Sequence, residues 1–370
     1  MALEDIRKDI DEIDGELLAL FLRRMDCARR VAEAKKGSGT PVYNEKRERE
    51  ILDSVSEKAG EFGGDARLLF SDLMAISRAE QHRLLGGGEP LRRAVQEAGT
   101  SLESPKKVAC LGQKGSYSHE ALLRLYPGAE PLFFPDFASV FAAVQGGNAD
   151  LGVAPVENSL AGSVAEVYDL ILKYRFSIVQ ALSLPIWHCL ASSETDLLNI
   201  KTVYSQPQAL SQCSEFLKTH FLHTEPFSST AEAALEARKP GIAAVCSHPA
   251  AAECGLHVLA DGIQNNSANR TRFIAVSRRL VLPENAQKIS LCFSVPHRTG
   301  TLSSVLSRFS AAGLNLTKIE SRPIAGKNFE YDFYLDFTGN IREAHTLDLL
   351  CALHDELPRF SFLGNYAEEE

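Results

Sequence analysis

The hydrophobic residues near the start of the chain recur with the spacing of a long helix. Residues 3–35 contain no proline and a single glycine, and their apolar positions follow a 4-3-4-3 rhythm that places them on one helical face. The residues of this face are Ile6, Ile10, Ile13, Leu17 and Leu20. The sequence Gly-Ser-Gly-Thr-Pro at 37–41 predicts the end of the helix.

Two shorter helices are expected next, over residues 45–58 and 65–85. Three helices in so short a segment form only a small core. We therefore expect this all-α domain, residues 1–88, to pair with a second copy as a dimeric helical bundle. Glycine and proline interrupt the pattern at 86–90, and we interpret residues 89–105 as a linker.

The pattern changes in residues 106–282, where short apolar strands alternate with helices. This alternation is typical of βαβ units and predicts an α/β domain. A weak internal repeat between residues 136–156 and 229–247 predicts two similar lobes. We expect a clamshell of the periplasmic-binding type, with binding residues beyond the carboxyl ends of its strands. The expected strands are Val108–Leu111, Leu132–Phe134, Leu151–Val156, Val203–Ser205 and Ile242–Cys246.

The last region, residues 287–366, has a third pattern. Strand, helix, two strands, helix and strand follow one another, which predicts an α+β domain of the ferredoxin-like βαββαβ class. The expected strands are 289–295, 314–321, 330–337 and 361–363, and the expected helices are 302–312 and 342–353.

Composition narrows the possible functions. The 370 residues are too many for one core, and a formal net charge of −9 argues against nucleic acid or an anionic membrane as a partner. The eight cysteines have neither CxxC spacing nor nearby histidines at metal-ligand spacing, so we expect reduced, mostly buried thiols and no metal. The charged first segment is unlike a signal peptide, and no apolar run reaches the ~18 residues of a membrane span, so we expect a cytoplasmic protein.

An acidic protein that binds anionic substrates must place its positive groups locally, so clustered basic residues are informative. Arg24 and Lys35 lie within about 20° of one face of the first helix. Arg7 is rotated about 100° from Arg24, so it would fit the pocket of a second copy better. Ser77 and Gln81 share a face of the third helix. The alternative is plain solvation, because charged residues on a long helix usually face water.

The three helices resemble the all-α chorismate mutases over residues 3–85. The matching residues are Arg7, Asp14, Arg23-Arg24, Lys35, Pro41-Val42-Tyr43, Arg47-Glu48, Ser77 and Gln81. The resemblance implies a site for chorismate in which Arg7 of one protomer and Arg24 of the other hold the two carboxylates. It also implies that Lys35 and Gln81 donate hydrogen bonds to the ether oxygen as the C–O bond breaks.

The same resemblance assigns the remaining positions. Glu48 would accept a hydrogen bond from the ring hydroxyl, with Arg47 and Ser77 in support. Asn44 stands where some members have an aspartate that also contacts this hydroxyl, and an amide still forms hydrogen bonds. A Claisen rearrangement needs no nucleophile and no proton transfer, so catalysis would consist of holding a reactive conformer and aiming donors at developing negative charge.

Small polar residues follow the expected strands of the middle region. They include Ser116, Glu157-Asn158-Ser159, Ser205, Ser247 and Thr271. Backbone N–H groups at helix starts, together with hydroxyls, form sites for anions. Helix capping is the alternative for each serine or threonine alone, but it fits Thr271 less well, because this residue follows a polar loop and enters a strand.

These segments resemble prephenate dehydratase, in family order, across residues 107–280. The motifs are Gly115-Ser116-Tyr117-Ser118, Pro155-Val156-Glu157-Asn158-Ser159, Thr202-Val203-Tyr204-Ser205, Pro207-Gln208-Ala209 and Thr271-Arg272-Phe273. The resemblance implies that Thr271 is the residue most closely tied to catalysis. The implied substrate-binding residues are Ser116, Glu157, Asn158, Ser159, Ser205, Gln212, Arg272 and Phe273. Gln206 departs from the histidine common at its position and receives no role.

Prephenate becomes aromatic by losing carbon dioxide and hydroxide together. A threonine hydroxyl is a weak acid, so we interpret Thr271 as a positioned hydrogen-bond donor rather than a proton reservoir. The source of the proton stays open, with His119 and His248 as candidates, although a single histidine at a helix start is more often structural.

The last region resembles the ACT regulatory domain of phenylalanine-pathway dehydratases. The matching segments are Ser294–Leu302, Gly313–Leu316 and Glu320–Pro323. The resemblance implies that L-phenylalanine is bound as an effector at the interface of paired domains. The implied residues are Gly300, Thr301, Leu302, Asn315, Glu320, Ser321, Arg322 and Pro323. Thr301 stands where alanine is more usual, and a purely dimerising module is the alternative.

Together the resemblances imply a bifunctional enzyme of phenylalanine biosynthesis, an isomerase and a lyase, that converts chorismate to prephenate and prephenate to phenylpyruvate. We expect inhibition by L-phenylalanine, no cofactor, and a homo-oligomer that is a dimer or a dimer of dimers. Three alternatives remain. They are a dehydratase acting on arogenate, a dehydratase whose helical domain only dimerises, and an amino-acid-responsive binding protein.

Overall fold

The computed structural model describes residues 3–324 and 326–370 and divides into two compact units. The first unit combines the described residues up to Glu97 with Ile289–Phe362. The second combines Ala98–Lys288 with Leu363–Glu370. The helical region and the last α+β region, which the sequence predicts as separate domains, thus belong to one unit.

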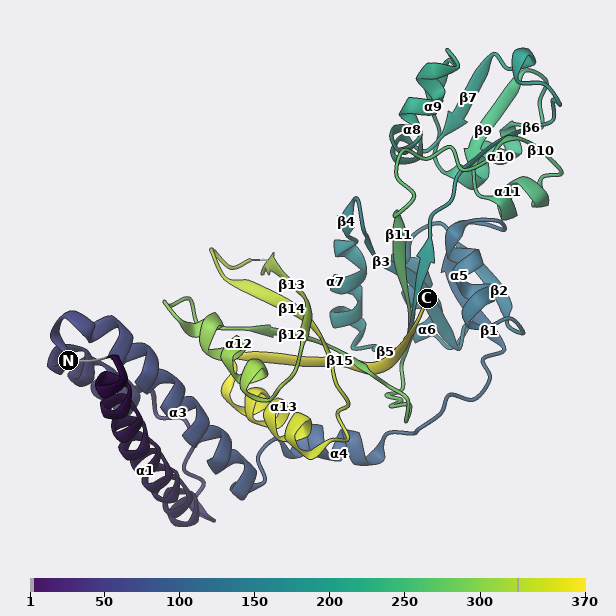
Figure 1. Ribbon diagram of the computed structural model, residues 1–370. Coiled ribbons are helices and arrows are strands. Elements are labelled where there is room, and N and C mark those ends of the chain that lie inside the picture. The colour runs from purple at the N-terminus through teal and green to yellow at the C-terminus, as the bar shows by residue number, and fades with distance from the viewer. Residues whose placement is uncertain (1–2, 325) are drawn as a thin grey trace. The chain divides into compact units, whose positions relative to one another are not determined.

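The first unit begins with helices whose ends follow from local chemistry (Figure 1). The Asn44 side chain accepts a hydrogen bond from the backbone N–H of Arg47 and so caps α2, and α3 ends at Gly86, which adopts a left-handed conformation with φ 69°. Both α1 and α2 pack against α3. The helices are α1 (Leu3–Lys35), α2 (Glu45–Lys58), the short 3₁₀ turn η1 (Gly60–Phe62), α3 (Gly63–Leu85) and α4 (Glu89–Glu97).

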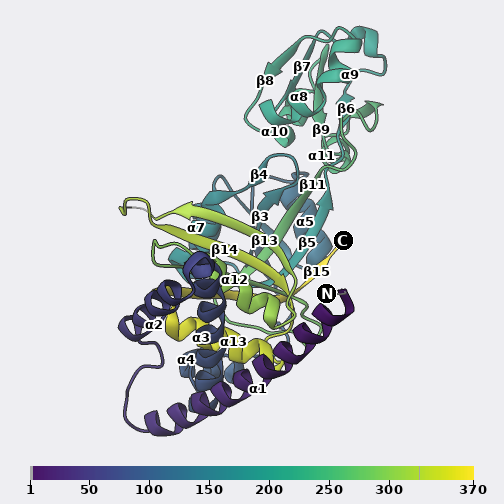
Figure 2. The same ribbon diagram turned by 60° about the vertical axis from the view of Figure 1, so that its left-hand side comes forward.

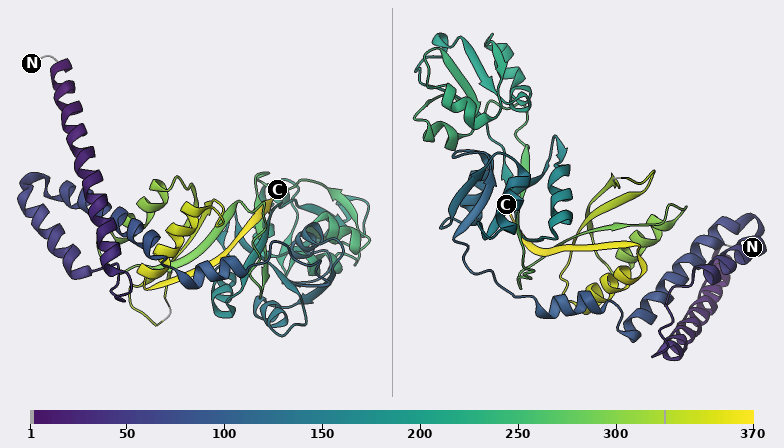
Figure 3. Two further views of the ribbon diagram at one scale, coloured as in Figure 1. Left: turned by 90° about the horizontal axis from the view of Figure 1, so that it is seen from below. Right: turned by 180° about the vertical axis from the view of Figure 1, so that it is seen from behind.

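The apolar face of α1 that the spacing predicts is not covered within this chain. Ile10, Ile13, Leu17 and Leu20 are each 50–56% exposed. Figure 3 shows most of α1 as a single straight helix standing clear of the other helices of its unit. Large apolar side chains in a row at this exposure form a surface that favours association.

The predicted linker, residues 89–105, contains a helix. Leu91 and Val95 of α4 are four residues apart, share one face and are buried, and α4 packs against α13 (Ala344–Glu356). Arg92 also pairs with Asp348 of α13 at 2.6 Å. The chain from 89 to 97 is therefore part of the first unit rather than a free connection.

The rest of the first unit follows the expected succession of strand, helix, two strands, helix and strand. Its strands lie in the order β13-β14-β12-β15, with β13 at the edge, and buried Phe309, Phe337 and Leu350 contribute to its core. Both α12 and α13 pack against α3 (Figure 2). The elements besides α13 are β12 (Lys288–Ser294), α12 (Thr301–Ala311), β13 (Leu316–Pro323), β14 (Tyr331–Thr338) and β15 (Arg359–Glu369).

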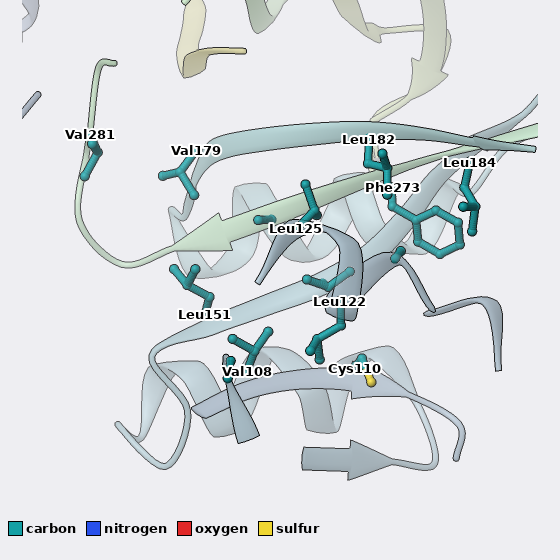
Figure 4. Close-up of a cluster of buried hydrophobic side chains, with 14 residues drawn as sticks. Val108, Cys110, Leu122, Leu125, Leu151, Val179, Leu182, Leu184, Phe273 and Val281 are labelled. Atoms are coloured by element: carbon teal, nitrogen blue, oxygen red, sulfur yellow. The ribbon is translucent and has the colours of Figure 1, made fainter. Parts of the chain in front are cut away.

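The first lobe of the second unit is built on a mixed sheet. Its strands lie in the order β5-β11-β3-β1-β2, and the end of β15, residues 367–369, pairs in parallel with β5. Leu122, Leu125 and Phe273 lie in the buried cluster that joins this sheet to α5 (Figure 4). The elements are β1 (Lys107–Leu111), α5 (Tyr117–Leu125), β2 (Glu130–Phe134), α6 (Phe137–Gln145), β3 (Leu151–Asn158), β4 (Gly162–Ser163), α7 (Ala165–Tyr174), β5 (Ser177–Pro185) and β11 (Arg270–Ser277).

The second lobe of this unit lies between β5 and β11 in the sequence, so the chain crosses between the lobes twice. Its strands lie in the order β10-β6-β9-β7-β8. The elements are β6 (Cys189–Ser192), η2 (Leu197–Asn199), β7 (Thr202–Ser205), α8 (Pro207–Gln212), α9 (Ser214–Thr219), β8 (Thr224–Pro226), α10 (Thr230–Glu236), β9 (Ile242–Cys246), α11 (His248–Glu253) and β10 (His257–Ala260).

The described part of the chain contains free cysteines only. Six of the eight are buried, whereas Cys27 is exposed and Cys254 is half-buried. No described helix is both long and apolar enough to cross a membrane. Among the described residues, no group of three or more His, Cys, Asp and Glu side chains could hold a metal ion.

Candidate functional site

The first candidate site lies where α1 and α3 pack together. Arg24 donates from Nη1 to the Leu73 carbonyl oxygen at 2.7 Å and to the Ser77 hydroxyl. Ser77 in turn donates to the same carbonyl oxygen at 2.8 Å. Two of the predicted site residues, Arg24 and Ser77, are therefore in direct contact.

Lys35 fixes the turn that follows α1. Its ammonium group donates to the carbonyl oxygens of Pro41 at 2.8 Å and Val42 at 3.0 Å. Burial lowers the pKa of Lys35, and the negative charge of Glu48 opposes that shift. Burial likewise lowers the pKa of Arg24, again against the charge of Glu48. Glu48 therefore lies near both cations.

Glu48 is held by a residue that the sequence analysis does not identify. Arg78 donates from Nη1 to both carboxylate oxygens of Glu48 at 2.5 Å. The Arg78 guanidinium also lies over the ring of Tyr43, 5.2 Å from its centroid. No motif or helical spacing marked Arg78, which directly follows Ser77 in the sequence.

Gln81 completes this group from the next turn of α3. It is buried, and its Nε2 donates to the Ser77 carbonyl oxygen at 3.2 Å. Its Oε1 is buried without a hydrogen-bond partner among the described residues. A buried amide with one unused end is costly unless a ligand satisfies it, so Gln81 has the character of a binding residue.

Two predicted residues lie away from this group. Arg7 is 17 residues before Arg24 on the same straight helix, which separates them by about 26 Å. Arg47 is exposed and pairs with Glu50 at 3.6 Å. Within one chain, therefore, Arg7 cannot reach the group formed by Arg24, Lys35 and Glu48.

The second candidate site lies where the chain returns from the second lobe into β11. Thr271 is opposite Asn158 in the antiparallel pairing of β11 with β3. The Asn158 side chain donates to the Thr271 hydroxyl oxygen at 2.9 Å and to Asn269 Oδ1 at 2.8 Å. Because the Thr271 oxygen accepts this hydrogen bond, its own proton stays available for donation to a bound molecule.

Asn158 itself is locked in place. Its Oδ1 accepts from the backbone N–H groups of Leu160 at 3.1 Å and Ala161 at 2.9 Å. Ser159 accepts at its hydroxyl from the Arg270 N–H at 3.0 Å, so it braces the same crossing. A fixed amide that orients a hydroxyl is an arrangement suited to catalysis by positioned donors.

Beside this crossing, His188 contacts residues of both lobes. The sequence analysis does not identify this histidine. His188 Nε2 lies 3.0 Å from Gln212 Oε1, and His188 Nδ1 lies 3.1 Å from the Tyr117 hydroxyl. Tyr117, from the first lobe, donates to the Trp187 carbonyl oxygen at 2.8 Å. Burial lowers the pKa of His188, so its neutral form is favoured at neutral pH. Contacts of His188 with Tyr117 and with Gln212 therefore connect the two lobes.

Other predicted residues have structural partners. Ser116 caps α5 by accepting from the His119 N–H at 3.3 Å, and Ser205 donates to the Val245 carbonyl oxygen at 2.6 Å. Glu157 lies next to Asn158 on β3 and opposite Arg272. Ser247, of the second lobe, donates to the Gly115 carbonyl oxygen at 2.9 Å. Of these contacts, the one between Ser247 and Gly115 joins the second lobe to the first, whereas the one between Ser205 and Val245 lies within the second lobe.

Arg272 and Phe273, both predicted to bind substrate, have other roles in the structure. Arg272 pairs with Glu368 at 2.6 Å and donates to the Tyr366 hydroxyl at 2.5 Å. Phe273 is 2% exposed within the hydrophobic core of the first lobe. The resemblance extends along the whole motif, and within it the Thr271 side chain accepts a hydrogen bond from Asn158.

The two histidines considered as proton sources differ in environment. His119 accepts from the Gly115 N–H at 3.1 Å, and burial lowers its pKa, which is a structural role. His248 lies 2.7 Å from Asp261 Oδ1, a hydrogen bond that raises the pKa of His248. In the part of the chain that the structure describes, neither histidine forms a hydrogen bond with Thr271 or Asn158.

The predicted effector residues divide into two groups. Gly300, Thr301 and Leu302 line a cavity of about 210 Å³ together with Tyr331 and Phe333. Gly300 has φ 83°, and its left-handed conformation starts α12. The remaining residues, Asn315, Glu320, Ser321, Arg322 and Pro323, do not line this cavity, and four of them belong to the edge strand β13.

A carboxylate at the end of α13, that of Glu356, makes the stability of the first unit depend on pH. Burial alone would raise the pKa of Glu356, but the contact with His82 and the charges of Arg308 and Arg78 outweigh it and lower this pKa to about 2. The depressed pKa stabilises the fold fully above about 4.5, the ordinary value, and the stabilisation is lost as the pH falls toward 2. The size of this contribution is about 3 kcal/mol.

We expect Glu356→Gln to destabilise the protein most near neutral pH, and the difference from wild type to shrink as the pH falls below about 4.5. Urea unfolding followed by circular dichroism across this pH range measures the difference. Glu330→Gln is the matched control, because Glu330 is exposed and pairs with Lys327. A difference that stays constant from neutral to acid pH would contradict the linkage.

Comparisons with known proteins address both sites. The family model described as prephenate dehydratase matches residues 108–280, and the model described as chorismate mutase type II matches residues 6–82. A bifunctional chorismate mutase/prephenate dehydratase of Aquifex aeolicus (strain VF5) is 33% identical over 372 residues, which cover 98% of this chain and 97% of that relative.

Two further relatives each match most of the chain. Arogenate dehydratase 5, chloroplastic, of Arabidopsis thaliana is 36% identical over 322 residues, covering 80% of this chain and 75% of the relative. The crystal structure of prephenate dehydratase in complex with L-Phe from Arthrobacter aurescens has 32% identity and a TM-score of 0.65, covering 70% of this chain and 89% of that one.

Proposed function

This chain belongs to the family of bifunctional chorismate mutase/prephenate dehydratases, and we propose that it converts chorismate to prephenate and prephenate to phenylpyruvate. The observation that carries the proposal is the match to a bifunctional relative along 98% of the chain. Each of the two regions matched by a family model contains its own group of polar residues. In the first region Arg24, Lys35 and Glu48 lie near one another, and in the second Asn158 orients Thr271.

For the mutase reaction, the residues of the helical pocket supply positive charge and hydrogen-bond donors. Arg24 binds a substrate carboxylate, and Lys35 and Gln81 donate to the ether oxygen as the bond breaks. Glu48 accepts from the ring hydroxyl, with Asn44 and Ser77 in support, whereas Arg47 is exposed within one chain. The rearrangement transfers no proton, so rate enhancement comes from holding a reactive conformer and stabilising negative charge that develops in the transition state.

For the dehydratase reaction, Thr271 donates a hydrogen bond to the departing hydroxyl of prephenate. Asn158 fixes the direction of this donor, and Gln212, Ser205 and Ser159 shape the surrounding surface. Loss of carbon dioxide supplies the electrons that expel hydroxide and complete the aromatic ring. The protein therefore needs to align the ring carboxylate with the leaving group and assist departure, which positioned donors do.

The mutase pocket needs a second copy of the chain. The second substrate carboxylate requires a cation, and Arg7 lies about 26 Å along α1 from Arg24 of its own chain. The exposed apolar face of α1 supports pairing of two chains along this helix, which would bring Arg7 of the partner subunit into the pocket. We propose a homodimer assembled on α1.

Leu17→Glu is expected to dissociate the assembly and to remove most mutase activity, because it places a charge in the exposed apolar face of α1. Dehydratase turnover of added prephenate should persist. Lys8→Glu is the control, since nine residues along the helix place it on about the opposite face. Sedimentation velocity measures the mass, and an unchanged assembly with full mutase activity would contradict pairing on this face.

The C-terminal region of the first unit is proposed to be an ACT domain that binds L-phenylalanine. The βαββαβ succession, the turn at Gly300 and the edge position of β13 support this assignment. A structure related to the dehydratase region was determined in complex with L-Phe. Feedback inhibition requires that phenylalanine bind one arrangement of the protein more tightly than another.

One assay tests the whole proposal. Purified protein receives chorismate alone, and prephenate and phenylpyruvate are followed with and without phenylalanine. Formation of phenylpyruvate that falls when phenylalanine is added supports all three assignments. If chorismate is untouched while added prephenate is consumed, the helical domain only dimerises the protein. Failure to convert any of these acids would favour an amino-acid-responsive binding protein.

An arogenate dehydratase is the second candidate for the α/β unit. The observation that favours it is the 36% identity to the Arabidopsis relative named for that activity. Arogenate carries an amino group where prephenate carries a keto group. Parallel assays with both acids decide the preference, and a higher kcat/KM for arogenate would replace prephenate as the proposed substrate.

A further inference from the structure

Arg78 connects the proposed mutase pocket with the C-terminal part of the first unit. Its Nη1 donates to both oxygens of Glu48 on α2 at 2.5 Å. Its Nε donates to Oε2 of Glu356 at the end of α13 at 3.0 Å. One guanidinium therefore bridges a carboxylate of the proposed active site and a carboxylate of the proposed regulatory domain.

The bridge belongs to a buried ionic cluster. Glu356 also accepts from Arg308 Nη1 of α12 at 3.0 Å, and its other oxygen lies 3.2 Å from His82 Nε2 of α3. The side chains of Arg78, Glu356 and Arg308 are only 9–11% exposed. In such surroundings, removing one member leaves its partners charged and unpaired, so each member depends on the others for its position.

Glu48 is constrained on one side by this cluster and faces the mutase cations on the other. Its charge raises the pKa values of Arg24 and Lys35 against the effect of burial, so it lies within electrostatic reach of both. The hydrogen bonds from Arg78 to both carboxylate oxygens restrict the conformations of the Glu48 side chain. A shift of Arg78 would change the position of the carboxylate that is proposed to meet the ring hydroxyl.

A cavity lies beside the contacts of Arg78. The side chains of Arg78 and Glu356 therefore have space to move. A cavity of about 510 Å³ is lined by Glu48 and Arg78 on the helical side and by Glu356, Gly300 and Thr301 on the C-terminal side. The last two residues belong to the turn proposed to take part in effector binding. A movement of the turn at Gly300 and Thr301 would therefore change the shape of the cavity that Glu48 and Arg78 also line.

We propose that Arg78 is a positioning residue for the mutase reaction, and that its contact with Glu356 makes the mutase site dependent on the C-terminal domain of the same chain. This inference rests on the proposed mutase function. Arg78 acts through Glu48 and does not itself contact substrate. Phenylalanine bound to the C-terminal domain would alter the mutase reaction by displacing Glu356, and with it Arg78 and Glu48.

The first test is Arg78→Met in the full-length protein. We expect mutase kcat to fall about tenfold or more, because a hydrogen-bonded charge pair is lost, with a smaller change in KM. Dehydratase turnover of added prephenate stays at the wild-type rate, and the helical signal in circular dichroism shows that the first unit, which contains Arg78, is folded. Arg83→Met is the matched control, since Arg83 lies on the same helix, is exposed, and pairs with Glu80 one turn away.

Arg78→Lys separates positioning from simple loss of charge. A lysine cannot bridge two carboxylates with the fixed geometry of a guanidinium, so mutase activity should recover only in part. Full recovery would show that any positive charge suffices and would overturn the positioning role.

The second test is Glu356→Gln, which weakens the contact with Arg78 but changes no residue that is proposed to meet the substrate, so mutase kcat should fall here as well. Phenylalanine should then inhibit the dehydratase as in wild type but lose its effect on the mutase. The double variant Arg78→Met/Glu356→Gln should be no slower than Arg78→Met alone, because the two residues act as one unit. Glu343→Gln, an exposed carboxylate at the other end of α13, is the control.

The outcomes distinguish this inference from the proposed function. Wild-type protein without mutase activity would remove the proposed function itself. Wild-type activity together with unchanged mutase kinetics in Arg78→Met would overturn the positioning role and leave the proposed function intact. If the effects of Arg78→Met and Glu356→Gln multiply in the double variant, the two residues act independently and the coupling through their contact is excluded.

Discussion

Lys35→Ala is expected to remove nearly all mutase activity while prephenate is still converted to phenylpyruvate. Lys35 ends α1 with its ammonium group bound to the carbonyl oxygens of Pro41 and Val42, so its position is fixed before substrate arrives. As the C–O bond of chorismate breaks, negative charge develops on the ether oxygen, and a fixed cation stabilises this charge without reorganisation. Loss of one such donor reduces kcat by about 10²–10³-fold.

The adjacent residue supplies the control for this prediction. Lys36→Ala removes the same charge from the next position, which is exposed. Initial rates with chorismate and, separately, with prephenate measure the two activities of each variant. Loss of both activities in Lys35→Ala would contradict separate sites, and retention of the mutase rate would remove Lys35 from the mechanism.

Helical periodicity identified the long elements of the chain well. The expected helices at 3–35, 45–58 and 65–85 agree closely with α1, α2 and α3. Their signals are local, because an apolar face, a cap or a glycine can be seen within a few residues. The helix α4 was interpreted as linker because its nine residues carry only two buried apolar side chains, whose partner α13 lies far away in the sequence.

The expected strands of the α/β region are all present; β11 is expected only as the strand that Thr271 enters, and β5 is not among the expected strands. The residues of β5 and β11 are buried at most positions, so their sequences lack the polar–apolar alternation that reveals a half-buried strand. The end of β15 likewise pairs with β5, nearly 190 residues away, which no local pattern can reveal.

For the candidate sites too, contacts between residues far apart in the sequence could not be predicted. Thr271 and Asn158 could be identified by resemblance, and their hydrogen bond follows from the pairing of β11 with β3. Arg78 and His188 have no local signature, because their partners, Glu356 and Gln212, lie on distant elements. Arg272 and Phe273 adjoin Thr271 in the motif, but Arg272, the next residue along the strand, points to the opposite face, and Phe273 is buried in the core of the first lobe.

Thr271→Ala is expected to yield a protein that makes prephenate from chorismate and stops there. The hydroxyl of Thr271 accepts from Asn158, which leaves its proton directed away from that amide and available to the departing hydroxyl of prephenate. Alanine keeps the strand and removes the only group that this residue contributes to the reaction. Loss of a positioned donor reduces kcat on the order of 10²-fold or more.

Thr271→Ser and Thr219→Ala make this prediction specific. Serine keeps the hydroxyl and should retain most of the dehydratase rate, whereas Thr219 hydrogen-bonds within its own helix, to the Glu215 carbonyl oxygen at 2.9 Å, and its replacement should leave both activities unchanged. Prephenate accumulation from chorismate is followed together with phenylpyruvate formation in one reaction. Phenylpyruvate formed by Thr271→Ala at the wild-type rate would exclude this hydroxyl from the reaction, and Asn158 would then have to act on the substrate directly.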